Sequence, residues 1–129
     1  CPGHPDRPAH WLFQDLFQYL SITLSLATLC PPAATRDSIL AILICGSGIG
    51  MSMVANKFKG IRAGICQSIE AAKDGKEHSD LNVLVLAGDF MSIEEATKII
   101  DTWLNSEFLN GRYAERLEMI KKIEEKNMK

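Results

Sequence analysis

The sequence predicts an α/β protein: a Rossmann-like, three-layer fold in which helices cover both faces of a parallel sheet. Continuous aliphatic runs at 40–44 and 83–87 have the length and composition of buried strands, a short strand is expected at 61–65 between them, and helical patterns separate the three. Strands that alternate with helices form parallel sheets through right-handed crossovers. The chain has 129 residues, 47 % hydrophobic and 23 % charged, which is the size and balance of one globular domain.

The first 38 residues do not follow this alternation. Prolines lie near both ends of the segment, and an apolar stretch runs between them from Trp11 to Cys30. Two glutamines and Asp15 interrupt the stretch, and a carboxylate is costly inside a bilayer, so an amphipathic or buried helix is favoured over the alternative of a membrane span. The chain is therefore divided into an atypical N-terminal segment, 1–38, and an α/β domain, 39–129.

The elements of the α/β domain follow one another at short intervals. After the first strand come a glycine turn at 46–50, a helix at 51–58, the second strand, a helix at 68–76 and the third strand. Ser92 with Glu95 three residues later predicts a capping box at the start of the next helix. Helical spacing gives that helix one apolar face, formed by Ala96, Ile99, Ile100, Trp103 and Leu104. Tyr113, Leu117 and Ile120 repeat the spacing in a last helix with a charged end.

Charge and cysteine usage exclude several classes of partner. The net charge of −2 gives no general attraction to nucleic acid or to an anionic membrane. The four cysteines form no CxxC pair, and the α/β pattern is typical of a cytoplasmic protein with reduced thiols. Two disulfides remain the alternative for an even number of cysteines.

A cysteine and three glycines at alternate positions follow the first strand, in the segment ILICGSGIGMSMVANK. Ligands of parallel sheets bind beyond the carboxyl ends of the strands, where Cys45 is expected. Gly46, Gly48 and Gly50 let backbone N–H groups approach a ligand, and the next helix directs its N-terminus to the same place. The turn therefore suits a phosphate or an oxyanion, with the Cys45 thiolate as nucleophile or base.

Local sequence alone leaves several interpretations of this turn open. A dinucleotide site and a cysteine phosphatase loop fit poorly, because Met51 occupies the place of the third glycine in the first and of the arginine in the second. The phosphocysteine loop of sugar-transport IIB domains fits better, with Cys45, two glycines and Ser52. A turn that serves only packing is also common after a buried strand.

The glycine turn and three motifs further along the chain together resemble one family. They are the Cys-Gly-x-Gly-x-Gly loop, the Ala-Asn-Lys-Phe and Gly-Ile-Arg-Ala stretch, the His-x-Asp-x-Asn turn and the Gly-Arg-x-x-x-Arg start of the last helix. Together they resemble ribose-5-phosphate isomerase of type B, in the family shared with the galactose-6-phosphate isomerase subunits. The resemblance covers residues 40–124, and a IIB domain is not expected to carry the last three motifs together.

The resemblance implies an enzyme that interconverts ribose 5-phosphate and ribulose 5-phosphate without metal or cofactor. Cys45 would be the base that moves a proton through an enediolate, and His78 would help to open the furanose ring. The backbone N–H groups of the turn would hold the enediolate oxygens. Ser79 would lie at the sugar, and the two arginines of the last helix would hold the phosphate. These substrate-binding residues are Gly46, Ser47, Gly48, Gly50, Ser79, Arg112 and Arg116.

The chain also departs from the family pattern. Ser79 replaces an asparagine that often follows the histidine, and residues 1–38 contain neither the Asp-His pair nor the Asp-Tyr-Pro tyrosine of the family's N-terminal strands. The alternatives are therefore a catalytically impaired remnant of the family and a phosphocysteine carrier. The resemblance further implies a homodimer with shared sites, which requires that Cys45 and His78 lie far apart within one subunit.

Overall fold

Three parallel strands form the centre of the described part of the chain, which is residues 40–128 of a computed structural model. The strands are β1 (Ala41–Cys45), β2 (Ala63–Ile65) and β3 (Val83–Ala87). Their order in the sheet is β1-β3-β2, and in the register Cys45 lies opposite Ala87 and Ala63 lies opposite Val83. The predicted parallel α/β fold is confirmed. The atypical segment 1–38, for which the sequence predicts a helix, lies outside the described residues.

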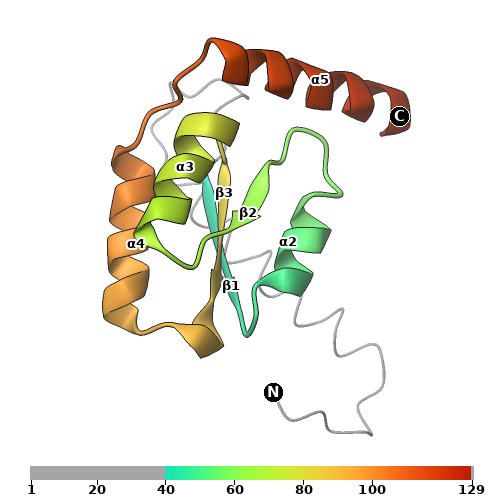
Figure 1. The fold of residues 1–129 in the computed structure, drawn as a ribbon. Helices are drawn as coiled ribbons and strands as arrows, with labels where there is room; N and C mark the ends of the chain where they lie inside the picture. The colour runs from blue at the N-terminus through green and yellow to red at the C-terminus, as the bar shows by residue number, and fades with distance from the viewer. Residues whose placement is uncertain (1–39, 129) are drawn as a thin grey trace, which may run out of the picture.

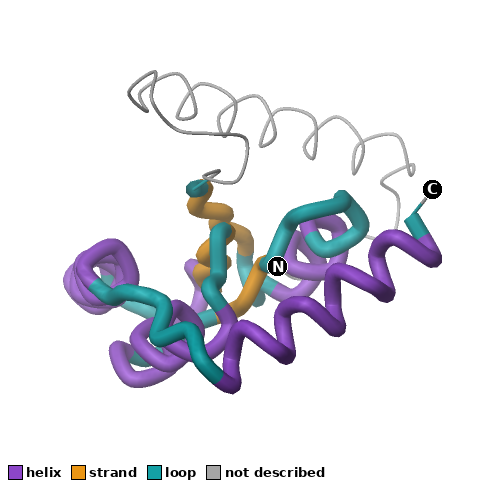
Figure 2. The backbone as a smooth tube through the Cα atoms, turned by 90° about the horizontal axis from the view of Figure 1, so that it is seen from above, coloured by secondary structure: helices purple, strands orange, loops and turns teal. Residues whose placement is uncertain are grey.

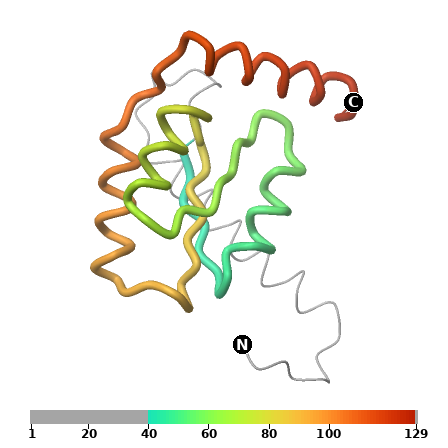
Figure 3. The backbone as a smooth tube through the Cα atoms, viewed as in Figure 1, coloured from blue at the N-terminus to red at the C-terminus, as the bar shows by residue number. Residues whose placement is uncertain are grey.

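Helices cover both faces of this sheet (Figure 1). They are α2 (Ile49–Ala55), α3 (Ile69–Ser79), α4 (Ile93–Asn105) and α5 (Arg112–Asn127), with a short 3₁₀ helix, η1 (Gly88–Phe90). One face carries α3 and α4, and the other carries α2. The backbone trace in Figure 3 shows the ends of β1 and β3 at one end of the sheet and α5 across the other end.

The alternation of side chains along β3 builds two core layers. Leu84 and Leu86 point to the α3–α4 side, where they pack with Ile99 and Trp103. Val83 and Val85 point to the opposite side, towards α2. All five residues of β3 are buried, as its continuous aliphatic sequence predicts for a central strand.

The first strand is less buried than its sequence predicts. The aliphatic run before Cys45 indicates a strand covered on both faces, but the Ile44 side chain is 48 % exposed. Among residues 40–128, β1 pairs only with β3, so β1 is an edge strand there. Apolar composition reports the tendency to be buried, whereas the position in the sheet decides how much covers the strand.

Two helix boundaries also differ from the prediction. The helix after the glycine turn begins at Ile49, because Gly48 adopts a left-handed φ of 77° and serves as its N-cap, and Gly50 therefore lies within the helix. The next helix extends to Ser79, so His78 lies in a last helical turn and not in the polar turn that the sequence indicates.

The capping box of α4 is confirmed. Ser92 Oγ accepts a hydrogen bond from the Glu95 N–H at 3.2 Å, and the Glu95 carboxylate accepts one from the Ser92 N–H at 2.8 Å. Ile99 and Trp103 are buried on the predicted apolar face, but Leu104 is 54 % exposed and is not part of it.

The last helix is held to the domain by few contacts. None of the residues of α5 is buried, and Ile120 is 45 % exposed although its spacing predicts an apolar contact. Figure 2 shows α5 running along one side of the molecule to the C-terminus. No helix within residues 40–128 has the length and hydropathy needed to cross a bilayer.

Candidate active site

Cys45 is the last residue of β1, and the turn that follows bends back towards its sulfur. The Gly48 N–H donates a hydrogen bond to Cys45 Sγ at 3.2 Å, and the Ile49 N–H donates to Ser47 Oγ at 3.3 Å. Cys45 is a free cysteine and is half-buried. An N–H group directed at sulfur stabilises negative charge there, as a nucleophile or base requires.

The glycines of the turn meet different requirements. Gly48 needs its left-handed φ, and a side chain there would crowd Ile65 and Val85, each 3.3 Å from the position of a Cβ. A Cβ on Gly46 would lie 2.7 Å from Asp89 Oδ2, so this carboxylate lies against the turn. No atom of residues 40–128 lies within 4 Å of a Cβ on Gly50, so no described side chain covers the backbone of α2 there.

Three predicted site residues gather around Tyr113, near the junction of α3 and α5. The His78 ring stacks on the Tyr113 ring, with centroids 4.4 Å apart and planes inclined by 14°. The guanidinium carbons of Arg112 and Arg116 lie 5.0 and 5.6 Å from the centre of the same ring. Ser79 is the exposed last residue of α3, next to His78. We call His78, Arg112, Tyr113 and Arg116 the Tyr113 cluster.

Electrostatics connect the members of this cluster. Arg112 Nη2 donates a hydrogen bond to the Tyr113 hydroxyl at 2.9 Å, and this bond raises the pKa of the exposed guanidinium.

A second group of side chains lies at His78. Asp74, Glu77 and His78 place one ligand atom each within 4.8 Å of one another. Among the described residues these three could hold a metal ion, although exposed acidic groups often lie together without one.

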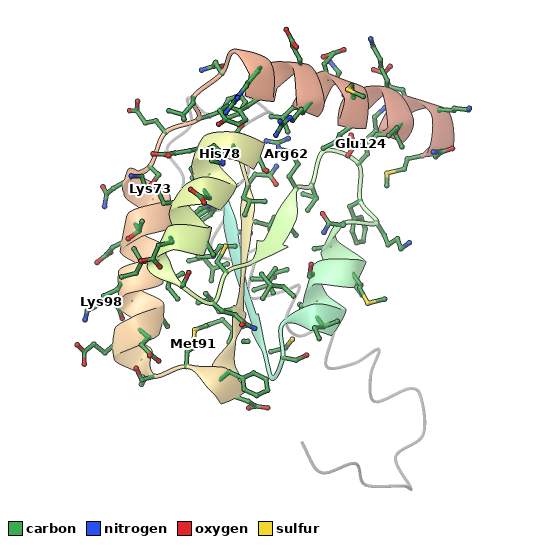
Figure 4. The ribbon with its side chains drawn as sticks, in the orientation of Figure 1. Arg62, Lys73, His78, Met91, Lys98 and Glu124 are labelled. Carbon is green, nitrogen blue, oxygen red and sulfur yellow. The ribbon has the colours of Figure 1, made fainter. Side chains whose placement is uncertain are left out.

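The structure does not bring Cys45 and His78 together within one copy of the chain. Cys45 lies opposite Ala87, at the carboxyl end of β3, whereas His78 lies in the α3 turn that leads to the amino end of β3. A five-residue strand separates the two ends by roughly 13 Å. Figure 4 shows His78 beside α5. Met91, which follows η1, lies at the opposite end of the molecule in the same view.

Two motif residues prove to have structural partners. Asn82 is buried, accepts the Arg62 N–H at 2.7 Å and donates to the Gly60 carbonyl at 2.7 Å. Asn56 donates to the Ala63 carbonyl and accepts its N–H, both at 2.9 Å. These amides join the start of β2 and the residues before it to neighbouring segments, so the motifs that contain them contribute to the fold.

An ion-pair network supports the turn after His78. Asp80 adopts a left-handed φ of 44° and accepts hydrogen bonds from Arg62 at 3.2 Å and from Lys76 at 2.7 Å. A cavity of about 540 Å³ opens beside this network, between the start of β2 and α5. Arg62, Asp80 and Glu124 line it, and Glu124 accepts the Gly60 N–H at 3.2 Å.

Sequence reasoning missed two residues of these sites. The spacing of Tyr113 predicts only an apolar helix face, although its place between Arg112 and Arg116 in the Gly-Arg-x-x-x-Arg motif is a further signal. No sequence pattern singles out Asp89, although it follows β3 closely at the end of the sheet where Cys45 lies. Contacts between distant segments reveal both.

Comparisons with known proteins agree with the motifs. A model of the family described as Ribose/Galactose Isomerase matches residues 14–120, and so extends into the segment 1–38. Ribose-5-phosphate isomerase B of Escherichia coli is 42 % identical over 85 residues, which are 66 % of this chain and 57 % of that protein. A putative sugar phosphate isomerase of Bacillus subtilis is 44 % identical over 87 residues, which are 67 % of this chain and 58 % of that protein.

Solved structures show the same similarity. Ribose-5-phosphate isomerase B from Mycoplasma genitalium with bound ribulose-5-phosphate has 40 % identity and a TM-score of 0.66, over 67 % of this chain and 57 % of that one. The Clostridium thermocellum structure has 37 % identity and a TM-score of 0.69, over 83 % and 68 %. The chain spans 57 % and 58 % of the length of the two curated relatives compared with it.

Proposed function

The chain belongs to the ribose/galactose isomerase family, and we propose that it interconverts ribose 5-phosphate and ribulose 5-phosphate with Cys45 as the base. One observation carries the residue assignment: Cys45 ends β1 inside a glycine turn whose Gly48 N–H points at its sulfur from 3.2 Å. The relative from Mycoplasma genitalium, whose structure holds ribulose-5-phosphate, supports a sugar phosphate as the substrate class.

In the proposed reaction the Cys45 thiolate takes the proton from C2 of the open-chain aldose. The electrons of the broken C–H bond form an enediolate, the hydroxyl proton of O2 passes to O1, and return of the carbon-bound proton to C1 leaves the carbonyl at C2. The step is redox-neutral within the sugar, so it needs no external oxidant. The N–H groups of the turn, Gly46–Gly50, would donate hydrogen bonds to the enediolate oxygens where negative charge develops.

A second copy of the chain would complete the site. In this proposal His78 of the other copy assists ring opening, Ser79 contacts the sugar, and Arg112 and Arg116 bind the phosphate dianion. The separation of Cys45 and His78 within one copy supports a shared site, because a pentose phosphate must reach both groups at once. The proposal includes a homodimer in the cytoplasm, where charged sugar phosphates are retained by the membrane.

The function is tested by the conversion of ribose 5-phosphate to ribulose 5-phosphate by the purified chain. We expect turnover in the parent chain and a loss of at least about a hundredfold in Cys45→Ala, because this substitution removes the proposed base. Cys45→Ser is the matched control, since it keeps the size of the side chain but offers a much weaker base.

The main alternative is a family member with impaired catalysis, because residues 1–38 contain neither the Asp-His pair nor the Asp-Tyr-Pro tyrosine that the family carries. A folded parent chain without turnover would establish this alternative. Equal turnover in the parent and in Cys45→Ala would reject Cys45 as the base. Stable ³²P-labelling of Cys45 by a phosphorylated donor protein would favour the carrier function instead.

A further inference from the structure

We propose that Tyr113 is a positioning residue of the isomerase site: it orients the His78 imidazole and holds Arg112 and Arg116 beside it. The inference rests on the proposed function, because it concerns the side chains that would open the sugar ring and bind its phosphate. It is carried by the Tyr113 cluster, in which one aromatic ring contacts three functional side chains.

The Tyr113 ring stacks on the His78 imidazole. A histidine near a helix end has a broad choice of ring orientation about its second side-chain torsion. The near-parallel Tyr113 ring, 4.4 Å away, covers one face of the imidazole and restricts that rotation. The ring plane decides where the imidazole N–H and lone pair point, so the stack orients the group that would transfer a proton.

Tyr113 also contacts the two arginines of the cluster. Arg116 is three residues after Tyr113, so helical spacing alone places it on the same face. Arg112 is adjacent to Tyr113 in sequence, and adjacent helical residues do not face each other. The hydrogen bond from Arg112 Nη2 to the Tyr113 hydroxyl, 2.9 Å long, holds this guanidinium beside the ring. The hydroxyl therefore brings Arg112 into the cluster, and the ring serves both arginines.

The attachment of α5 to the rest of the domain is weak. The helix has no buried residue, and its arginines must keep a fixed position relative to His78 on α3. Near the junction, the Leu109 N–H donates to the Glu77 carbonyl at 3.1 Å, and at the far end Gly60 donates to Glu124 at 3.2 Å. The stack of Tyr113 on His78 adds a contact between side chains at the place where the functional groups meet.

Two variants separate the hydroxyl from the ring. Tyr113→Phe keeps the stack and removes the hydrogen bond. We therefore expect KM for ribose 5-phosphate to rise by about threefold or more, with little change in kcat. Tyr113→Leu also removes the stack, so we expect kcat to fall by about tenfold. Leu117→Ala is the matched control, because it trims a half-buried residue of α5 outside the cluster.

Two readouts do not depend on turnover. In ¹H–¹³C NMR spectra, assigned with His78→Asn, the ring current of Tyr113 shifts the His78 ring signals. We expect the shift to persist in Tyr113→Phe and to disappear in Tyr113→Leu, with Leu117→Ala like the parent chain. Titration with inorganic phosphate, followed on the arginine side-chain signals, is expected to show weaker binding in both Tyr113 variants.

The inference is overturned if Tyr113→Leu keeps the His78 ring signals and the phosphate affinity of the parent, or if Leu117→Ala produces the same losses. These outcomes differ from failure of the proposed function. A parent chain without isomerase activity refutes the isomerase assignment, whereas the ring signals and phosphate binding still decide whether Tyr113 positions these groups.

Discussion

At the scale of single residues, Gly48 shows how the candidate site depends on backbone geometry. Its φ of 77° makes it the N-cap of α2, which begins at Ile49, four residues after Cys45, and its own N–H donates to the Cys45 sulfur. Left-handed backbone costs other residues about 1–2 kcal/mol. The space around Gly48 is also closed by Ile65 and Val85. The glycine therefore satisfies two constraints at once.

We predict that Gly48→Ala destabilises the protein more than Gly60→Ala does. Both glycines have positive φ, 77° and 81°, but no atom of the described part of the chain lies within 4 Å of a Cβ on Gly60. Backbone strain should lower the free energy of unfolding by about 1–2 kcal/mol in either variant, and crowding should add about 1 kcal/mol or more at Gly48. Urea unfolding of the two variants measures the difference, and equal losses would show that the neighbours of Gly48 yield without cost.

The two described cysteines have opposite surroundings. Cys45 is half-buried beside the Gly48 N–H, whereas Cys66 is 2 % exposed inside the α3–α4 core. Burial raises the pKa of the Cys66 thiol from 9.0 to about 11. Cys66 therefore stays a neutral, packed side chain, and of the two cysteines Cys45 is the one available for chemistry.

We predict that the stability contributed by Cys66 decreases as pH rises from 9 to 11. Above pH 9 the unfolded chain releases the thiol proton, whereas the folded chain keeps it until about pH 11. The unfolded state then binds fewer protons, so the free energy of unfolding falls with rising pH, by up to about 3 kcal/mol. Urea unfolding at pH 8 and pH 10.5 should show a smaller pH dependence in Cys66→Ala, and an equal dependence would contradict this burial effect.

At the scale of elements, local signals were reliable where a pattern is satisfied within one segment. The capping box of α4 and the buried run of β3 need only neighbouring residues, and both are confirmed. Leu104 and Ile120 have the correct helical spacing but are exposed, because no described element packs over them. Spacing selects a face of a helix, whereas neighbouring elements decide how wide the buried part becomes.

We predict that Ser92→Ala lowers the free energy of unfolding by about 1 kcal/mol, because the Glu95 N–H loses its acceptor at the start of α4. Thermal unfolding followed by circular dichroism measures the loss. Glu95→Gln is the control, since glutamine can complete the same capping box. A loss in Glu95→Gln as large as in Ser92→Ala would attribute the effect to the charge of Glu95 near the helix N-terminus.

At the scale of the whole molecule, the proposed site is divided between the two ends of the sheet. The turn with Cys45 lies at the carboxyl ends of the strands, and the Tyr113 cluster lies near their amino ends. A shared site in a homodimer would join the Cys45 end of one copy to the Tyr113 cluster of another. Within residues 40–128, the edge position of β1 also leaves Ile44 48 % exposed near Cys45.

We predict that two inactive variants, Cys45→Ala and His78→Ala, restore activity when their subunits are exchanged. Each mixed dimer would contain one site with both substitutions and one intact site. Random exchange at equal concentrations should therefore recover about one quarter of the parent activity if sites are independent. Mixing without exchange, or each variant mixed with itself, is the control. No recovery despite exchange verified by native mass spectrometry would reject the shared site.

The sequence by itself determined the α/β class, the places of the strands, the capping box and Cys45 at the end of a strand before a glycine turn. These features depend on short-range periodicity and on residue types with strong backbone preferences. The tertiary structure decided that His78 lies in the last turn of α3, that Asn56 and Asn82 hold loops at the start of β2, and that Tyr113 joins His78 to two arginines. These contacts depend on how α3, β2 and α5 pack, and packing between segments far apart in the chain leaves no periodic signal in the sequence.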